Sequence, residues 1–201
     1  MRWKELQFVL EENYLTNRKV TPKNRATLFD WLVNVHRMFK LLPETLHLTL
    51  RLIDTYCNAA NPPNRAYQLV GVTCLWIACK FEEIYVPNTD DFLYITENAF
   101  DLHELCECER SITNSIKFNL NPPTSLAFLK RAAKVAQVQS RPYNMAKYVL
   151  ELGFLSYEVT HYLPSHQAAA ALLLTSVLYN KIQSDRNPQL SIYLSIDILK
   201  I

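Results

Sequence analysis

The chain has 201 residues, 49% of them hydrophobic, and a formal net charge of +2 at pH 7. This length fits one large domain or two small ones with a core, and this charge is too small to indicate attraction to nucleic acid or to a membrane. Only two residues are glycine, which argues against glycine-rich phosphate loops and against many tight β-turns.

The first predicted element is a short amphipathic helix over residues 4–15. Its apolar side is formed by Leu6, Phe8, Val9 and Leu10. A small basic run follows, which we interpret as a solvated loop around a turn: Arg18, Lys19, Lys23 and Arg25. Residues 1–20 are therefore predicted to form a helix and a basic turn ahead of the main helices.

Two long helices are predicted next. Thr21 followed by Pro22 has the pattern of an N-cap with proline in the first turn, and this helix should run to about Lys40. Pro43 opens the second helix, the prolines after it end that helix, and Asn64 is expected to cap the helix that follows. The apolar stripes of the two helices are Leu28, Leu32, Val35 and Phe39, then Leu46, Leu50, Ile53 and Cys57.

The central predicted helix covers residues 68–83. Residues 69–79 carry no charge, and this stretch is shorter than the ~20 apolar residues that a bilayer requires. Apolar and polar residues do not alternate in it, so we predict a helix buried on all sides in a bundle. Lys80, Glu82 and Glu83 follow abruptly, and the helix therefore presents a charged patch at one end of the domain.

A short helix is expected from Pro87 to about Tyr94. The next helix starts at Asp101, which forms a capping box with Glu104 three residues later. Its apolar residues are Leu105, Cys108, Ile112 and Ile116. The segment 121–124, Asn-Pro-Pro-Thr, is the strongest boundary signal in the chain, because two prolines halt any helix.

The second half repeats the order of the first. Two amphipathic helices, over about 125–137 and 144–159, precede an apolar helix opened by Pro164. The stripe expected on the second of them is Tyr148, Leu152, Leu155 and Val159. Gln68 and Gln167 begin the two apolar helices at an offset of 99 residues, which indicates an internal duplication and two similar helical domains. A last helix should begin near Asn187 and Pro188. Counted with it, the second half is expected to have at least one helix fewer than the first half.

Catalytic or metal-binding groups are hard to assemble from this sequence. It contains no H-E-x-x-H, no G-x-S-x-G and no phosphate loop, and Cys106 and Cys108 lack a second pair at zinc spacing. The five cysteines are odd in number and three lie in helix-like apolar stretches, which favours reduced, intracellular thiols. We therefore expect a protein that is not an enzyme and that uses no cofactor and no metal.

Charged residues are more informative. Residues 81–109 contain nine acidic residues and no lysine or arginine, either as helix caps and a solvated face or as a docking surface for a basic partner. Lys80 and Glu109 fall on apolar stripes of different helices, and burying either charge unpaired would be costly. We expect them to pair with each other or to be completed by another protein, whereas Arg25 and Asp54 have the pattern of an internal clamp.

Several segments closely resemble the cyclin box: RATLFDWLVNVHRMFKLLPETLHLTLRLID, QLVGVTCLWIACKFEEIY and FLYIT. Two later segments, NPPTSLAFLKRAAKV and AKYVLELGFLSYEVTHYLPSHQAAAALLL, resemble the second box of B-type cyclins. The resemblance implies an all-α protein with two roughly five-helix cyclin folds in tandem, the second one incomplete. The implied domains are residues 1–20 (N-terminal helix and basic turn), 21–121 (first box) and 122–201 (truncated second box).

The resemblance also implies a function. Cyclins are regulatory subunits that bind and activate cyclin-dependent protein kinases, and the B-type likeness implies control of G2/M-like progression. Arg25 and Asp54 match the family's internal ion pair, and Thr113 stands where a leucine is common. The residues that match the family's kinase interface are Lys80, Phe81, Glu83, Glu109, Thr113, Phe118 and Leu120.

A second implied site is a hydrophobic patch that recruits substrates or inhibitors carrying an Arg-x-Leu motif. The matching positions are Asn24, Thr27, Leu28, Trp31, Asn34, Tyr67 and Gln68. Asn24 and Thr27 replace apolar residues, Tyr67 replaces a leucine, and Asn34 replaces the acid that receives the substrate arginine. The patch is therefore either a docking site, or Leu28 and Trp31 are simply core residues.

Two other functions stay open. One is a cyclin-fold adaptor similar to transcription factor IIB, which binds DNA and polymerase, and the other is the cyclin of a transcriptional kinase. The acidic segment and the Lys80 and Glu109 pair favour the cell-cycle regulator, for which we expect neither nucleic acid nor a membrane as partner. A salt-dependent affinity for duplex DNA would favour the adaptor.

Overall fold

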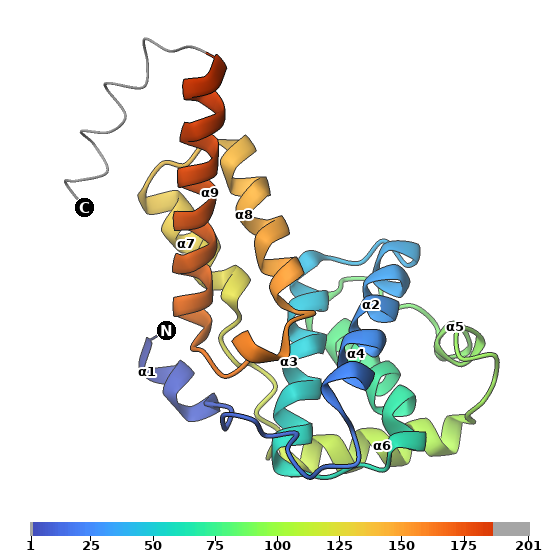
Figure 1. Ribbon diagram of the computed structural model, residues 1–201. Helices are drawn as coiled ribbons and strands as arrows, with labels where there is room; N and C mark the ends of the chain where they lie inside the picture. Colours follow the sequence, from blue (N-terminus) through green and yellow to red (C-terminus); the bar gives the residue numbers. More distant parts are fainter. Residues whose placement is uncertain (1, 187–201) are drawn as a thin grey trace. The chain divides into compact units, whose positions relative to one another are not determined.

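The computed structural model describes residues 2–186, and every regular element among them is helical, as predicted (Figure 1). The α-helices are α1 (Arg2–Glu5), α2 (Pro22–Met38), α3 (Pro43–Ala59), α4 (Tyr67–Glu82), α5 (Thr89–Tyr94), α6 (Leu102–Ser115), α7 (Ser125–Val135), α8 (Ser140–Gly153) and α9 (Pro164–Arg186). Three short 3₁₀ turns are η1 (Leu6–Phe8), η2 (Asn64–Ala66) and η3 (Tyr157–Val159).

The chain divides into two compact units. The first unit contains residues up to Thr124 and, in addition, the segment Gly153–Leu163. The second unit contains Ser125–Leu152 and the chain from Pro164 onward. The first unit is therefore discontinuous in sequence, which the sequence pattern does not predict.

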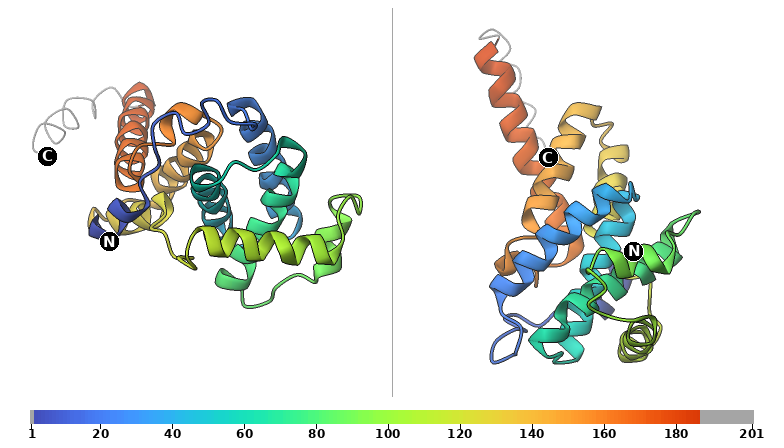
Figure 2. Two further views of the ribbon diagram at one scale, coloured as in Figure 1. Left: turned by 90° about the horizontal axis from the view of Figure 1, so that it is seen from below. Right: turned by 90° about the vertical axis from the view of Figure 1, so that its right-hand side faces the viewer.

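Helix α4 lies at the centre of the first unit, where it packs against α2, α3 and α6 (Figures 1 and 2). Cys74, Leu75 and Ala78 are 0% exposed, so the prediction of a helix buried in a bundle is confirmed. Close packing against α2 depends on Gly71, because a Cβ atom there would lie 2.8 Å from Cδ1 of Leu28.

Capping side chains start two of the helices as predicted. Thr21 forms a capping box with Asn24 at the start of α2, and Asp101 forms one with Glu104 at the start of α6. The backbone N–H of Glu104 donates to Asp101 Oδ1 at 2.8 Å. The prediction that Asn64 caps the central helix is wrong, because η2 lies between that residue and α4.

The prediction of one helix over residues 4–15 is wrong. Helix α1 and turn η1 end at Phe8, and the chain is not helical again until α2. Phe8 and Leu10 are buried, but Leu6 is 62% exposed and Val9 is 50% exposed, so the four residues do not form one apolar side. We call residues 9–20 the N-terminal strap.

Contacts distant in sequence explain why the strap is not a helix. The backbone N–H of Glu11 donates to Asn58 Oδ1 at 3.2 Å, and that of Leu15 donates to the Tyr157 hydroxyl at 2.7 Å. Asn13 has a left-handed φ of 58°, which a right-handed helix does not accommodate. The strap therefore bonds part of its backbone to tertiary partners, which propensity and periodicity do not report.

The prediction for residues 144–159 is also partly wrong, because α8 begins and ends earlier. Its predicted stripe faces outward, with Tyr148 60% exposed and Leu152 49% exposed. Ala146 and Leu150 are buried in their place. A small residue such as alanine lets helices pack closely. The buried face of α8 therefore carries smaller apolar side chains than the exposed face, which misleads a prediction from apolar periodicity.

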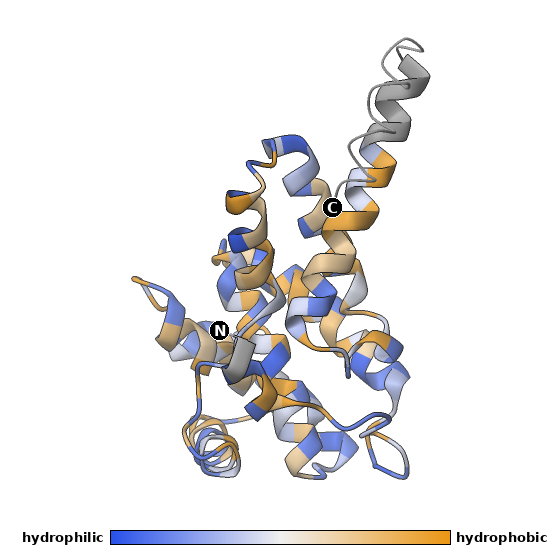
Figure 3. Ribbon diagram, turned by 90° about the vertical axis from the view of Figure 1, so that its left-hand side faces the viewer, coloured by the Kyte–Doolittle hydropathy of each residue, from blue (hydrophilic) through white to orange (hydrophobic). Residues whose placement is uncertain are grey.

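The second unit consists of α7, α8 and α9, and α7 packs along α9. Its core is formed by Leu129, Ala146, Leu150, Ala168 and Ala171. The described part of α9 also carries exposed apolar residues, and Figure 3 shows apolar turns along this helix. The helix predicted near Asn187 and Pro188 lies outside the described residues. None of the helices described is long and apolar enough to cross a membrane.

Candidate functional site

Lys80 and Glu109 meet at the surface of the first unit. Lys80 lies in the last turn of α4 and Glu109 lies in the middle of α6, and Lys80 Nζ forms an ion pair with Glu109 Oε1. The two side chains are 37% and 27% exposed. The charges are therefore neither far apart nor covered by the protein's own loops, and both remain accessible to a partner.

Trp76 supports the lysine from within the same helix. Lys80 Nζ lies 3.5 Å from the centroid of the Trp76 ring, well within the range of a cation–π contact. Trp76 and Lys80 share a face of α4, because positions four residues apart on a helix are neighbours. Trp76 itself is partly buried and packs against the core. The ammonium group is thus held between an aromatic ring and a carboxylate.

Exposed apolar residues lie near the two charges in sequence. Phe81, directly after the lysine, is 47% exposed, and Phe118 is 67% exposed. Phe118 follows the end of α6 with a left-handed φ of 55°, and its N–H donates to Thr113 O at 2.8 Å. Ile84 and Tyr85 are 88% and 89% exposed. Ile84 and Tyr85 are not among the residues predicted for the interface, since their exposure cannot be read from a pattern.

A buried ion pair joins α2 to α3, as the sequence predicts. Arg25 Nε donates to Asp54 Oδ1 at 2.8 Å, and the side chains are 2% and 6% exposed. Tyr14 donates to the same carboxylate oxygen at 2.6 Å, and Arg25 Nη1 donates to Phe154 O at 2.6 Å. Arg25 also lies over the Phe29 ring at 4.1 Å. Every strong donor of this cluster therefore has an acceptor inside the unit.

The charges of this cluster perturb its titration. Burial works to lower the pKa of Arg25, but the Asp54 carboxylate and its hydrogen bonds raise it above its usual value. Burial, and then the Asp54 charge, raises the pKa of Tyr14. The interpretation of the basic run as a solvated loop is thus wrong for Arg25, and Arg18 donates to Ala60 O at 3.4 Å.

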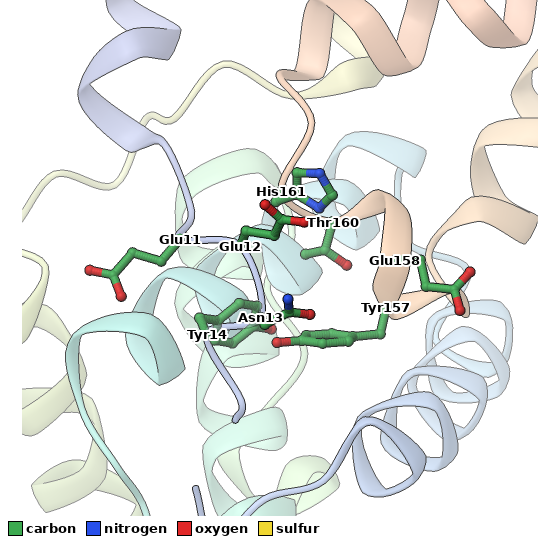
Figure 4. A pocket seen from close by; sticks show the side chains of 8 residues that line it. All are labelled: Glu11, Glu12, Asn13, Tyr14, Tyr157, Glu158, Thr160 and His161. Carbon is green, nitrogen blue, oxygen red and sulfur yellow. The ribbon is translucent and has the colours of Figure 1, made fainter. Parts of the chain in front are cut away.

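The strap and the segment 153–163 meet beside the buried pair. Figure 4 shows the Tyr14 and Tyr157 rings beside each other, and their centroids are 5.4 Å apart. A small cavity of about 110 Å³ lies here, lined also by Glu12 and His161. Tyr14, Phe154 and Tyr157 were not identified from the sequence, because nothing local to them indicates that they share a partner.

Comparison with known proteins places the chain in a family. The sequence model of the cyclin N-terminal domain matches residues 1–121, and that of the cyclin C-terminal domain matches residues 123–199. The chain belongs to the cyclin family. The duplication inferred from the sequence corresponds to these two domains.

The similar curated proteins are mitotic cyclins. The G2/mitotic-specific cyclin-B2 of Oryzias latipes is 45% identical over 174 residues, which are 87% of this chain and 45% of that protein. The G2/mitotic-specific cyclin-B of Spisula solidissima is 44% identical over 178 residues, which are 89% of this chain and 42% of that protein. This cyclin chain thus spans less than half the length of these relatives.

A solved structure with the same fold is a viral cyclin from herpesvirus saimiri. It has a TM-score of 0.77 and 19% identity, and the match covers 87% of this chain and 78% of that chain. At this identity the likeness shows the fold alone. The prediction of a cyclin fold is confirmed by this likeness together with the two domain matches.

Two of the residues matched to the kinase interface are occupied by contacts within this cyclin. Thr113 is 6% exposed and its hydroxyl donates to Glu109 O at 2.8 Å, so it offers little surface. Glu83 accepts from the Leu42 backbone N–H at 2.7 Å and from the Thr45 hydroxyl, which ties the end of α4 to the start of α3. Leu120 is partly buried against the core.

The acidic segment serves local structure to a large extent. Asp101 and Glu104 form the capping box of α6, and Asp91 completes one at the start of α5. Glu107 Oε1 lies 3.7 Å from His103 Nε2 on the same helix. Burial, and then the charge of Glu83, raises the pKa of Glu82. Caps and a solvated face therefore account for much of this run of acids.

The seven positions matched to the docking patch do not form one exposed surface. Leu28 is 7% exposed and Tyr67 is 4% exposed, and both belong to the core. Asn24 acts in the cap of α2, and Thr27 donates to Lys23 O at 3.0 Å, while Gln68 is exposed. The description of Leu28 as a core residue is thus supported.

Trp31 and Asn34 of the patch line an open groove of about 620 Å³. The other lining residues are Val35, Met38, Tyr94, Ile95, Glu97 and Asn98. Asn34 Nδ2 donates to Asp30 O at 3.0 Å on its own helix. Within the described residues, no group of three or more potential ligands could hold a metal ion.

Proposed function

We propose that this cyclin chain is a regulatory subunit that binds and activates a cyclin-dependent protein kinase in G2/M-like control. The observation that carries the proposal is the accessible Lys80 and Glu109 pair, with exposed Phe81 and Phe118 close to it in sequence. The mitotic-cyclin relatives support this choice over a transcription adaptor. The role implies action in the nucleus or cytoplasm.

The chain contributes surface to the kinase and no reacting group. An active kinase requires an ion pair between its strand lysine and its C-helix glutamate, with its metal-binding loop in place. A partner that binds this arrangement better than the inactive one shifts the population toward it. The Lys80 ammonium can donate hydrogen bonds to backbone carbonyl groups of an irregular kinase loop, and the Glu109 carboxylate can accept them from its backbone N–H groups. Phe81 and Phe118 can pack against an apolar face of a kinase helix.

The direct test is binding of Lys80→Ala and Glu109→Ala variants to a purified cyclin-dependent kinase. Each substitution leaves one charge without its partner inside a desolvated interface, so we expect affinity to fall by at least about 30-fold, or about 2 kcal/mol. Isothermal titration calorimetry measures the affinity, and phosphorylation of a peptide substrate measures activation. Circular dichroism checks that both variants fold.

Matched controls come from the same helix and from the second unit. Glu107→Ala removes an exposed carboxylate from α6, and Lys134→Ala removes an exposed ammonium from α7. Both controls should bind like the unaltered chain. Wild-type affinity in a folded Lys80→Ala or Glu109→Ala variant would contradict the proposal, as would salt-dependent binding to duplex DNA in place of the kinase.

The groove beside Trp31 supports a second, weaker site for Arg-x-Leu peptides. Trp31 offers apolar surface, but Asn34 supplies no charge for the arginine, so we expect affinity only in the high micromolar range. Asn34→Glu should tighten binding about fivefold at low salt, because an arginine and carboxylate pair adds a charge-assisted hydrogen bond. Fluorescence titration measures both affinities. Absence of binding at millimolar peptide for both forms would remove this site.

A further inference from the structure

Trp76 stands out among the residues of α4. Leu75 and Ile77, its neighbours in the chain, are 0% and 3% exposed, whereas Trp76 is only partly buried. The ring is therefore fixed on one side by the core while the ammonium of Lys80 lies over it at 3.5 Å. Its place in the helix, one turn before the lysine, makes this contact local in sequence.

A lysine side chain needs such support to act as a defined donor. It is long and flexible, and an exposed ion pair alone contributes little, because holding both side chains in one geometry costs entropy. An aromatic ring under the ammonium removes part of that freedom before any partner arrives. Groups that are already ordered in the free protein bind more tightly, since less freedom is lost on association.

We propose that Trp76 is a positioning residue that holds Lys80 beside Glu109, ready for the partner's backbone acceptors. This inference rests on the proposed function of the Lys80 and Glu109 pair. Trp76 acts through Lys80, and the partner that benefits is a protein with an irregular loop of exposed carbonyl groups, as in the proposed kinase.

The first experiment is a double-mutant cycle on kinase affinity with Trp76→Leu and Lys80→Met. We expect Trp76→Leu alone to weaken binding about fivefold, and to add no further loss when Lys80→Met is already present. Trp76→Phe should retain most of the affinity, because a phenyl ring still offers a π face. An equal effect of Trp76→Leu in both backgrounds would mean a merely structural role and would overturn the proposal.

A second experiment needs no kinase. The protons on Cε of Lys80 should be shifted upfield in NMR spectra of the free chain by the ring current of Trp76, and should return to ordinary lysine positions in Trp76→Leu. Ordinary shifts in the unaltered chain would overturn the proposal, even if Trp76→Leu failed to fold. Lys134, exposed on α7, serves as the reference lysine.

The two experiments separate the two possible failures. If Lys80→Met binds the kinase as well as the unaltered chain while the upfield shift is present, the proposed function of the site fails and the contact stands without a role in binding. If Lys80→Met weakens binding but Trp76→Leu does not, the proposed function stands and the positioning role of Trp76 is rejected.

Discussion

Burial strongly perturbs the titration of two thiols in the first unit, Cys57 and Cys79. Burial, and then the Asp54 charge, raises the pKa of Cys57 to about 12. Burial, and then the Glu83 charge, raises the pKa of Cys79 to about 12. In the unfolded chain each thiol titrates near 9.0. The folded state therefore holds these protons more tightly than the unfolded state does.

This difference predicts the sign of the pH dependence. Because the folded pKa is the higher one, the stabilisation is fully present below pH 9 and is lost as the pH rises from 9 toward 12. Each thiol should contribute a slope of about −1.4 kcal/mol per pH unit in that window. Urea unfolding at pH 8, 9 and 10 measures it.

A Cys57→Ala variant provides the control, since it removes one titrating group and should flatten the slope measurably between pH 9 and 10. Tyr148→Phe, at an exposed residue of α8, removes no thiol and should keep the full slope. A free energy of unfolding that does not change between pH 8 and 10 would contradict the assignment of raised pKa values to these thiols.

Residue-level prediction from the sequence succeeded where both partners lie on helices that were predicted correctly. Arg25 and Asp54 fall on such helices, and so do Lys80 and Glu109, and both pairs are present. Tyr14, which completes the first pair, lies in a segment wrongly predicted to be helical, so its contact could not be inferred. Where the secondary structure of a residue is predicted wrongly, the direction of its side chain is predicted wrongly as well.

At the scale of elements, proline marked helix starts reliably, and the predicted caps are right at Thr21 and Asp101 but wrong at Asn64. Pro22, Pro43 and Pro164 each open a helix, and Asp101 caps another. These signals are local, because they depend on the φ of proline and on orphan N–H groups in the first turn. The strap and α8 were mispredicted because tertiary contacts, not local preference, decide which of their residues are buried.

Contact between α2 and α4 gives a prediction at this scale. Replacing Gly71 with valine would push side-chain atoms into Leu28, whose Cδ1 is 2.8 Å from the position of a Cβ. Overpacking of this kind costs about 1–3 kcal/mol. Thermal unfolding of Gly71→Val should show this loss, and Leu28→Ala in the same chain should recover part of it by making room.

Gly153 is the matched control for this substitution. A Cβ there would meet only Val159 Cγ2, at 3.9 Å, and the residue ends α8 without a left-handed φ. Gly153→Ala should therefore leave stability unchanged or raise it by up to about 1 kcal/mol. Equal destabilisation by Gly71→Val and Gly153→Ala would argue against a steric origin.

At the scale of the whole molecule, the first unit is assembled from two separated pieces of chain. Arg25 and Phe154 are 129 residues apart in sequence, and Leu15 and Tyr157 are 142 apart. Periodicity and capping patterns act over a few residues and cannot report such contacts. The domain boundaries drawn from the sequence, at 20/21 and 121/122, remain a prediction.

Removal of one of these long-range contacts should be measurable. Tyr157→Phe deletes the hydroxyl that accepts from the Leu15 N–H at 2.7 Å, and we expect a loss of about 1–2 kcal/mol in the free energy of unfolding. Hydrogen exchange of the Leu15 amide should become faster. Tyr148→Phe, at a residue that is 60% exposed, should change neither quantity, and unchanged exchange in Tyr157→Phe would contradict the assigned bond.

The discontinuous first unit has a consequence during synthesis on the ribosome. Residues up to 124 emerge before the segment 153–163 that belongs to the same unit. At 5–20 residues per second, translating the roughly 30 residues between them takes about 1.5–6 seconds. During that interval the nascent chain carries Arg25 without the Phe154 carbonyl, so the first unit stays incomplete until the segment around Tyr157 has also left the ribosome.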